Sequence, residues 1–516
     1  MNIAIIGSGF AGTILARVLN RQGHEVTVIE RGHHPRFALG ESSTPLAALS
    51  LERLAARWGL DDLHDLATHG RWRRRFPELR RGKKRGFTFY AHRRGQPLTA
   101  TDRWLVAASP NDHIADVHWL RADVDAFLVD RARAEGVRIE EGAEIDDATP
   151  ADGGWSLRGN RDGRAYRCDV DWVVDASGGG ACLPRALGLT QVPFRFVPPT
   201  LLVAAHLTGE GPDATAQNEA SWSPGPYDDE WAAVHHLIDG GWIYALRFDH
   251  GVTSLGLVLR HDGLGSDDDD IDRVVATPRE SLFAWLGRYP TLARQWCDAE
   301  VVEVAAQRQV QRRWSTAVGD GWLLMPHTYG FASPLFSTGM AWSLRAVERI
   351  ATMFATPRLD PDRLEAYGTQ LASELDFMDE VIGGAYDLLD RPRHLLAYTF
   401  LYFAAASFSE SRERLLEPPD RGWAERGFLA SDETLVRRAQ ELERLARDRD
   451  EDSYWNQIEA AIRPINVAGL ADRTRDGLYP VDLDALVASA SRLGLSTAHV
   501  RAALPRLRGF QESMGL

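Results

Sequence analysis

The apolar pattern of the first 30 residues changes its period twice. Residues 2–6 form a short run of mainly apolar side chains, and residues 25–30 are rich in Val and Ile, as buried strands are. Between them, residues 11–22 carry apolar side chains at the spacing of an amphipathic helix. The pattern therefore predicts a strand, a helix and a second strand, the unit from which parallel sheets covered by helices are built.

Further along, the pattern favours strands in the middle of the chain and helices towards its end. The runs 200–209, 241–248 and 253–260 are apolar and β-prone, so they predict a sheet. From residue 360 onward the period is helical. The run 395–408 is shorter than the roughly 20 residues that cross a bilayer, and we expect a buried helix there.

These patterns divide the chain of 516 residues into three regions. We expect a nucleotide-binding α/β domain over residues 1–185, completed by residues 300–350. A β-rich substrate domain is expected over 186–300, and a helical region over 351–516.

Composition narrows the possible partners and compartment. The net charge of −14 gives no reason to expect nucleic acid or an anionic membrane as a partner. Three scattered cysteines and the acidic run 267–270 lack the spacing of metal ligands, so we expect no metal site and a solvated acidic loop. Without a basic leader before the first apolar run, no signal peptide is recognised, and we expect a cytoplasmic protein.

A glycine-rich motif occupies the first predicted strand–helix turn. Gly7, Gly9 and Gly12 have the spacing G-x-G-x-x-G, in which the first glycine permits the tight turn, the second lets a pyrophosphate approach and the third lets the helix pack on the strand. Glu30 ends the second strand, where a carboxylate can accept the ribose hydroxyls of an adenosine. The motif in this context predicts a dinucleotide site at the helix N-terminus.

Two later segments indicate which dinucleotide is bound. Residues 166–179 are predicted as a strand that ends at Asp175, and 317–350 hold a Gly-Asp pair, a strand, a turn and a helix from about Gly339. With the N-terminal unit, they resemble the FAD-dependent aromatic hydroxylases, which have a glutathione-reductase-like Rossmann fold. The resemblance implies FAD as the cofactor, with Asp320 on the ribityl chain and Arg121 also in contact. No second complete glycine motif is found for a nicotinamide.

Four motifs narrow the resemblance: "GESSTP" (40–45), "KKRGFTFY" (83–90), "GGWIYALRF" (240–248) and "FASPLFSTG" (331–339). In this order and spacing the chain is similar to flavin-dependent halogenases, most of all those acting on phenols or pyrroles, and residues 461–482 extend the similarity. The resemblance implies an FADH₂-dependent enzyme of secondary metabolism that chlorinates or brominates an electron-rich ring. It implies as partners a separate flavin reductase and a small aromatic substrate, either free or tethered to a carrier.

The essential lysine of such halogenases corresponds to Lys84. By resemblance, a flavin C4a-hydroperoxide and a halide give hypohalous acid, which this lysine directs to the ring as a haloamine or through a hydrogen bond. We expect Lys84 to point inward, and Lys83 and the neighbouring arginines to lie at the surface. The alternative is that residues 80–95, rich in Arg and Lys, are only a solvated loop.

The resemblance also implies the other site residues. Thr338 and Gly339 would hold the halide with their amides, although a plain helix cap is the alternative. The remaining expected residues are Pro334 and Gly339 at the cofactor, Glu41 and Ser42 in a flavin-lining loop (or as a capping pair), and Trp242, Tyr244 and Phe336 in the substrate pocket.

Two motifs depart from the family pattern. Halogenases commonly carry Trp-x-Trp-x-Ile-Pro, whereas this chain has Trp242, Tyr244, Leu246 and Arg247, and Ser333 replaces an Asp. These departures keep two alternatives open: an FAD-dependent monooxygenase or dehydrogenase on the same scaffold, and a protein that binds FAD without turnover.

Overall fold

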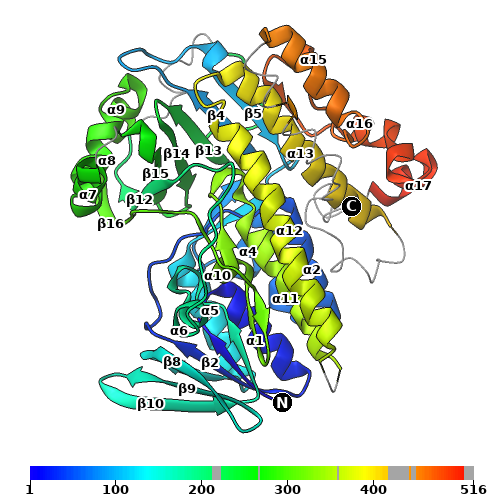
Figure 1. Cartoon of the computed structure of the whole chain (residues 1–516). Coiled ribbons are helices and arrows are strands. Elements are labelled where there is room, and N and C mark those ends of the chain that lie inside the picture. The colour runs from blue at the N-terminus through cyan, green and yellow to red at the C-terminus, as the bar shows by residue number, and fades with distance from the viewer. Residues whose placement is uncertain (212–221, 265–267, 357–358, 417–440, 443–448, 505–516) are drawn as a thin grey trace.

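The computed structural model describes residues 1–516 except 212–221, 265–267, 357–358, 417–440, 443–448 and 505–516 (Figure 1). The predicted first unit is confirmed, because β1 (Asn2–Ile6), α1 (Phe10–Arg21) and β2 (Glu25–Glu30) follow one another. β1 pairs in parallel with β2 and with β11 (Trp172–Asp175). The sheet has the order β18-β19-β11-β1-β2-β7, with β7 at Arg138–Glu141, β18 at Val318–Gly319 and β19 at Trp322–Leu324.

A second sheet of eight strands forms the other large layer, in the order β16-β12-β15-β14-β13-β4-β5-β21. The three predicted runs are confirmed as β12 (Thr200–Thr208), β14 (Gly241–Arg247) and β15 (Thr253–Arg260), joined by β13 (Ala233–Ile238). The sheet extends beyond the predicted range 186–300, because it also holds β4 (Gly86–Ala91), β5 (Arg103–Ala107), β16 (Glu300–Gln307) and β21 (Leu478–Tyr479). The substrate layer is therefore assembled from four separate parts of the chain.

The single strand predicted to end at Asp175 is instead two strands in different sheets. β10 (Arg164–Val170) pairs with β9 (Gly154–Arg161), which pairs with β8 (Ala143–Ala151) in a three-stranded antiparallel sheet. β11 lies in the parallel sheet next to β1. Asp171 separates β10 from β11, and its amide and carboxylate bond to Asn2 at the start of β1. The chain therefore changes sheets at this residue.

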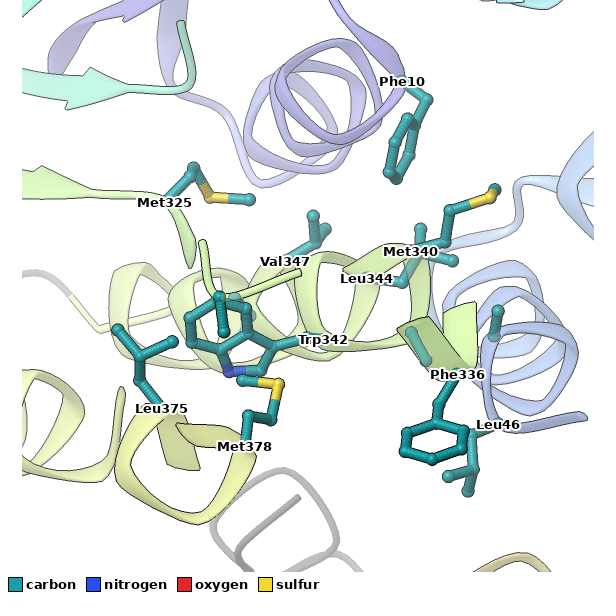
Figure 2. Close-up of a cluster of buried hydrophobic side chains, with 14 of the residues drawn as sticks. Phe10, Leu46, Met325, Phe336, Met340, Trp342, Leu344, Val347, Leu375 and Met378 are labelled. Carbon is teal, nitrogen blue, oxygen red and sulfur yellow. The ribbon is translucent and has the colours of Figure 1, made fainter. Parts of the chain in front are cut away.

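Helix α11 (Gly339–Phe354) lies at the centre of the core between α1, α2 (Pro45–Trp58) and α12 (Pro361–Tyr386). Its start agrees with the predicted helix from about Gly339. Figure 2 shows Leu344 and Val347 on one side of α11, and Trp342 towards Leu375 and Met378 of α12. Because side chains on opposite faces of α11 are all buried, packing fixes the position of its N-terminus.

The described parts of residues 360–504 are mainly helical, as predicted. The run 395–408 lies within α13 (Pro392–Leu415), whose middle is buried. In the described part of the chain, no helix combines the length and the apolar character that crossing a membrane requires. Helix α7 begins at Asp268, so the acidic run opens a helix instead of the predicted loop, and Asp267 lies outside the described residues.

The other elements connect or cover these layers. Helices α7 (Asp268–Ala276) and α8 (Pro278–Leu286) contact β16, with α9 (Pro290–Trp296) beside α8 (Figure 1). The remaining helices are α3 (Asp61–Asp65), α4 (His69–Arg75), α5 (Arg121–Ala134), α6 (Cys182–Ala186), α10 (Pro326–Tyr329), α15 (Glu451–Ile462), α16 (Leu483–Ala488) and α17 (Thr497–Ala503). The short strands β3 (Arg81–Lys84) and β6 (Asp116–Trp119) pair with each other, as do β17 (Arg312–Arg313) and β20 (Gly330–Phe331).

Candidate active site

A cavity of about 500 Å³ is lined by the turn after β1, the loop before α2, strand β14 and the N-terminus of α11. Most of the predicted site residues lie in its wall: Gly7, Gly9, Gly12, Glu30, Glu41, Ser42, Arg121, Trp242, Tyr244, Pro334, Thr338 and Gly339. Lys84, Asp320 and Phe336 are not among the lining residues. Segments that are far apart in the sequence thus meet at one place.

The geometry of the glycine turn fits a bound dinucleotide. Gly7 has φ +103°, and a Cβ there would lie 2.6 Å from the carbonyl oxygen of Ala176. A Cβ on Gly12 would lie 2.3 Å from the carbonyl oxygen of Gly7. On Gly9, the nearest atom to a Cβ is a side-chain nitrogen of Arg121, at 3.2 Å. Packing therefore requires Gly7 and Gly12, whereas Gly9 leaves room at the helix N-terminus where a pyrophosphate would bind.

Glu30 is held ionised at the end of β2. Its carboxylate accepts hydrogen bonds from the amide and hydroxyl of Ser8 and from the amide of Gly32. Burial opposes ionisation of Glu30, but the charge of Arg36 and these donors outweigh it and lower the pKa to about 2. A negative carboxylate thus lines the cavity where the ribose of an adenosine is expected.

Arg121 connects α5 to the loop that carries Glu41 and Ser42. Its Nε and Nη2 donate to the carboxylate of Asp125 at 2.9 and 2.7 Å. Its Nη1 donates to the carbonyl oxygen of Leu39 at 2.5 Å, on the loop itself. The guanidinium therefore holds this cavity wall in place, with Asp125 balancing its charge.

Asp320 is not where a ribityl contact would need it, which corrects the prediction. It is exposed in the turn between β18 and β19, and the only hydrogen bond to it in the described part of the chain is donated by Trp155 Nε1 to its carbonyl oxygen, at 3.1 Å. Ligands bind parallel sheets at the carboxyl ends of the strands, and Asp320 precedes β19. His327 follows β19 and lines the cavity. The order of the Gly-Asp pair before its strand, already visible in the sequence, is the signal that argues against a cofactor contact by Asp320.

Lys84 is completely buried beside this cavity. Its Nζ donates to Ser42 Oγ at 2.9 Å and to the Ser43 carbonyl oxygen at 2.7 Å, and lies 4.1 Å from the ring centroid of Phe87. Lys84 pairs with Asp116 in the β3–β6 ladder. Burial lowers the pKa of Lys84 to about 7, although the charge of Asp116 acts in the opposite direction. A fraction of the amine is therefore neutral near neutral pH.

The rest of the basic run divides between surface and interior. Lys83 is partly exposed and pairs with Asp112 at 2.6 Å, so the predicted alternation of Lys83 and Lys84 is confirmed. Arg81, however, is buried, and its Nη1 donates to the Leu79 carbonyl oxygen at 2.9 Å. The prediction that the arginines lie at the surface is wrong for Arg81, because its guanidinium lies against the preceding loop, donates to the carbonyl oxygens of that loop, and pairs with Asp249 at 3.5 Å.

A second cavity, of about 160 Å³, is lined by Phe87, over whose ring the Nζ of Lys84 lies. The segment 42–46 connects the two, because Ser42 lines the larger cavity and Thr44 to Leu46 line the smaller one. The remaining wall comes from Phe87, from α13 and from the C-terminal region, including Tyr402, Phe403, Ala406, Val467, Leu470, Tyr479 and Leu486. From the sequence, these parts of the chain were predicted only as a buried helix over 395–408 and as an extension of the family similarity over 461–482.

Stacked rings separate the two cavities. Trp242 stacks on His235 with centroids 5.1 Å apart, and His235 on Phe87 at 5.9 Å. Trp242 and His235 line the larger cavity, whereas Phe87 lines the smaller one. Trp242 Nε1 donates to the hydroxyl of Tyr386 at 2.9 Å, which fixes the orientation of the indole. The retained first Trp of the altered motif is thus part of a wall between two spaces.

The predicted substrate residues do not form one pocket. Trp242 and Tyr244 line the larger cavity, and Phe336 lines neither. Phe336 stacks on Tyr402 with centroids 4.6 Å apart, so it supports the smaller cavity from behind. The wall of the smaller cavity comes mainly from α13 and the C-terminal region, which are distant in sequence from the predicted substrate residues.

The turn before α11 has a strained backbone. Phe336 and Ser337 have φ values of +68° and +54°, which side chains rarely adopt. Ser333 Oγ accepts a hydrogen bond from the amide of Leu335 at 3.3 Å, so a hydroxyl here caps the turn, as the Asp that the resemblance implies at this position could. The amides of Thr338 and Gly339 line the cavity at the helix N-terminus and donate no hydrogen bond within the described residues.

No group of metal-ligating side chains is found among the described residues. The resident chemistry of the larger cavity is therefore that of a dinucleotide site, with a glycine turn, an ionised Glu30 and two helix N-termini. These features fit FAD.

Comparisons with known proteins agree with this geometry. A family model described as tryptophan halogenase matches residues 116–394, and one described as FAD dependent oxidoreductase matches residues 2–127. The chain is 28% identical to tetracycline 7-halogenase of Kitasatospora aureofaciens, over 75% of this chain and 69% of the relative. It is 26% identical to monodechloroaminopyrrolnitrin halogenase PrnC of Pseudomonas fluorescens, over 75% of this chain and 67% of the relative.

Among solved structures, that of halogenase PltM in complex with phloroglucinol and FAD has the same fold. It superposes with a TM-score of 0.82 at 20% identity, covering 92% of this chain and 99% of PltM. The predicted FAD-binding α/β fold with a sheet substrate layer and a helical region is confirmed. Since the tryptophan halogenase model spans residues 116–394 of 516, the chain belongs to this family of flavin-dependent halogenases.

Proposed function

We propose that this FAD enzyme halogenates an electron-rich aromatic ring, of phenol or pyrrole type, held in the smaller cavity. The observation that carries the proposal is the position of Lys84, whose Nζ bonds to Ser42 of the larger cavity and lies over the Phe87 ring of the smaller one. One buried amine thereby reaches both spaces. The names of the relatives, which include a tetracycline halogenase, support an aromatic substrate.

The halide is assigned to the turn before α11. Reduced FAD in the larger cavity, with O₂ and halide, supplies hypohalous acid there. The amides of Thr338 and Gly339 face this space at a helix N-terminus, where partial positive charge and free N–H groups favour an anion. The strained backbone at Phe336 and Ser337 aims these amides into the cavity.

Lys84 then carries the halogen from one cavity to the other. Its neutral amine can accept the halogen as a haloamine, and its ammonium can hydrogen-bond the acid; both place the halogen beside the ring. With hydrogen-bonded acid, the O–X bond breaks as the C–X bond forms, and the ring proton leaves with the hydroxide as water. With the haloamine, the O–X bond breaks as the N–X bond forms and water is released; the N–X bond then breaks as the C–X bond forms, and the ring proton returns to the amine. The stacked Trp242, His235 and Phe87 keep the ring away from the flavin.

The smaller cavity sets the size of the substrate. Its volume of about 160 Å³ is close to that of an engineered cavity that holds one benzene ring. Its wall is mostly apolar, from Phe87, Val106, Phe403 and Leu486. We therefore propose a single activated ring as the group that enters, free or at the end of a carrier arm.

The test uses the full chain with FAD, a separate flavin reductase, NADH and a panel of phenols and pyrroles, with and without chloride or bromide. Halogenated product that requires halide supports the proposal, whereas hydroxylated product without halide would show a monooxygenase. Ala406→Trp, which fills the smaller cavity, should abolish product while FAD binding stays unchanged. Arg412→Trp, on the exposed side of the same helix, is the matched control and should retain activity.

A further inference from the structure

Arg312 is a cation in the wall of the FAD cavity that has no counter-charge among the residues that the structure describes. It lies on β17, in the connection from the second sheet back to the nucleotide domain. Its Nη2 donates to the carbonyl oxygen of His327 at 2.7 Å, and its Nε is buried without a hydrogen-bond partner in the described part of the chain. No carboxylate of the described residues forms an ion pair with it. Burial alone lowers the pKa of Arg312 to about 10.

The other cavity arginines that are mostly buried differ from it in this respect. Arg121 is balanced by Asp125 at 2.7 Å, and Arg36 by Glu30 at 3.2 Å. A guanidinium taken out of water without an anion is unfavourable, so such a group is retained where a ligand supplies the charge. Arg312 remains protonated at neutral pH and offers donors in a planar fork that matches phosphate.

The surroundings of Arg312 place it next to the dinucleotide turn. Its guanidinium lies 3.9 Å from the Cβ position of Gly179, in the loop that follows β11. The same loop contacts the glycine turn, since a Cβ on Gly7 would meet the Ala176 carbonyl oxygen at 2.6 Å. The loop 176–180 therefore connects Arg312 to the turn at which a pyrophosphate binds.

His327 fills the space near Arg312 without adding charge. Burial, with the charges of Arg312 and Arg121, lowers the pKa of His327 to about 3, so the ring is neutral. Its Nε2 is buried and has no hydrogen-bond partner in the described residues. The two arginines thus act on the same part of the cavity, and only Arg312 has its charge free.

We propose that Arg312 binds the diphosphate of FAD beside the glycine turn, across the loop 176–180, as a charged hydrogen-bond donor. The inference rests on FAD as the cofactor and not on halogenation, so it is tested by binding. Arg313 provides a matched control, because neighbouring strand residues point to opposite sides and Arg313 pairs with Asp376.

The experiment measures the dissociation constants of FAD, ADP and riboflavin for the flavin-free chain by titration calorimetry. Arg312→Gln should weaken the binding of FAD and of ADP by about tenfold or more, which corresponds to the loss of one charged hydrogen bond. The affinity for riboflavin should be unchanged. Arg313→Gln should bind all three as the wild type does. Unchanged FAD affinity in Arg312→Gln, or an equal loss for riboflavin, overturns the proposal.

A milder variant keeps the test decisive if Arg312→Gln does not fold. Arg312→Lys keeps the charge but loses the planar fork of donors. It should therefore weaken the binding of ADP several-fold and leave the affinity for adenosine unchanged. Equal ADP affinity in Arg312→Lys and wild type would contradict the proposed phosphate contact. Because no turnover is involved, these results stand whether or not the enzyme halogenates a given substrate.

Discussion

Nζ of Lys84 lies 2.9 Å from Oγ of Ser42, so the buried amine touches the wall of the FAD cavity through one hydroxyl. Ser42 Oγ also accepts a hydrogen bond from Ser337 Oγ at 3.1 Å, in the turn before α11. Two serines thus connect the proposed halide turn to the lysine. Because Phe87 lies beneath the same amine, the connection ends at the smaller cavity.

Lys84→Ala should lower halogenated product at least about 100-fold while reduced flavin is still oxidised by O₂. The residues that hold FAD lie elsewhere, and the lysine acts only after hypohalous acid is released. Lys84→Arg should fail too, because a guanidinium is bulkier and does not deprotonate. Product chromatography and O₂ consumption measure the two steps separately.

Lys83→Ala is the control, since Lys83 pairs with Asp112 on the partly exposed face of β3. It should keep most of the activity. If both Lys84→Ala and Lys83→Ala halogenate normally, the basic run 80–95 is only a solvated surface. The proposal would then lose Lys84 as its central residue.

The amount of halogenated product per flavin oxidised should rise as the pH increases through about 7. Lys84 has a folded pKa of about 7, below its ordinary value, so the neutral amine replaces the ammonium as pH increases. If the haloamine is the reacting form, product per flavin oxidised grows about tenfold between pH 6 and 8. Asp116→Asn removes a charge that raises the pKa of Lys84, so its profile should shift to lower pH. A profile that falls with pH would assign the role to the ammonium.

The N-terminal nucleotide unit was predictable because local rules determine it. A buried strand, a glycine turn and a helix leave little freedom, and Gly7 and Gly12 are required by contacts within the same unit. The family resemblance implied that Lys84 points inward, and the alternation of an extended strand then placed Lys83 on the opposite side. Such patterns need no knowledge of distant segments.

The smaller cavity was not predictable in this way. Its wall joins Phe87 of β4 to Tyr402 of α13 and to Leu470 near the C-terminus, which are adjacent only in the folded chain. Asp320 was expected at the cofactor from the family resemblance, but it lies exposed in the turn before β19 and does not line the cavity. The burial of Arg81 also depends on a tertiary contact, its ion pair with Asp249 at 3.5 Å, beside the local hydrogen bonds to carbonyls of the loop 76–79.

Gly9→Ala should separate folding from cofactor binding. A Cβ on Gly9 meets only the flexible end of Arg121, so the melting temperature of the flavin-free chain should stay within about 2 °C. The methyl group would occupy the approach of the pyrophosphate, and FAD affinity should fall at least about tenfold. Gly12→Ala is the contrasting variant, because its Cβ would clash with a backbone oxygen; it should lower the melting temperature by about 4 °C or more.

NADH or NADPH alone should leave the bound flavin oxidised, because the sequence holds no second glycine motif for a nicotinamide. Stopped-flow absorbance of the FAD-loaded enzyme should show no bleaching until a flavin reductase is added. The FAD should also be released on denaturation, since exchange with a reductase requires non-covalent binding. Direct bleaching by NADH would refute the need for a separate reductase, and flavin retained after denaturation would contradict the exchange.

Trp242→Ala should weaken the separation of the two cavities. The indole stacks on His235 and is oriented by Tyr386, so its removal opens the ring stack between flavin and substrate. Hypohalous acid should then escape, and less halogenated product should form for each flavin oxidised. A soluble amine such as taurine traps the escaped acid and makes the loss measurable as haloamine absorbance. Trp242→Phe keeps a stacked ring but loses the hydrogen bond, so it should fall between wild type and Trp242→Ala. Equal coupling in all three proteins would show that the ring stack is only core packing.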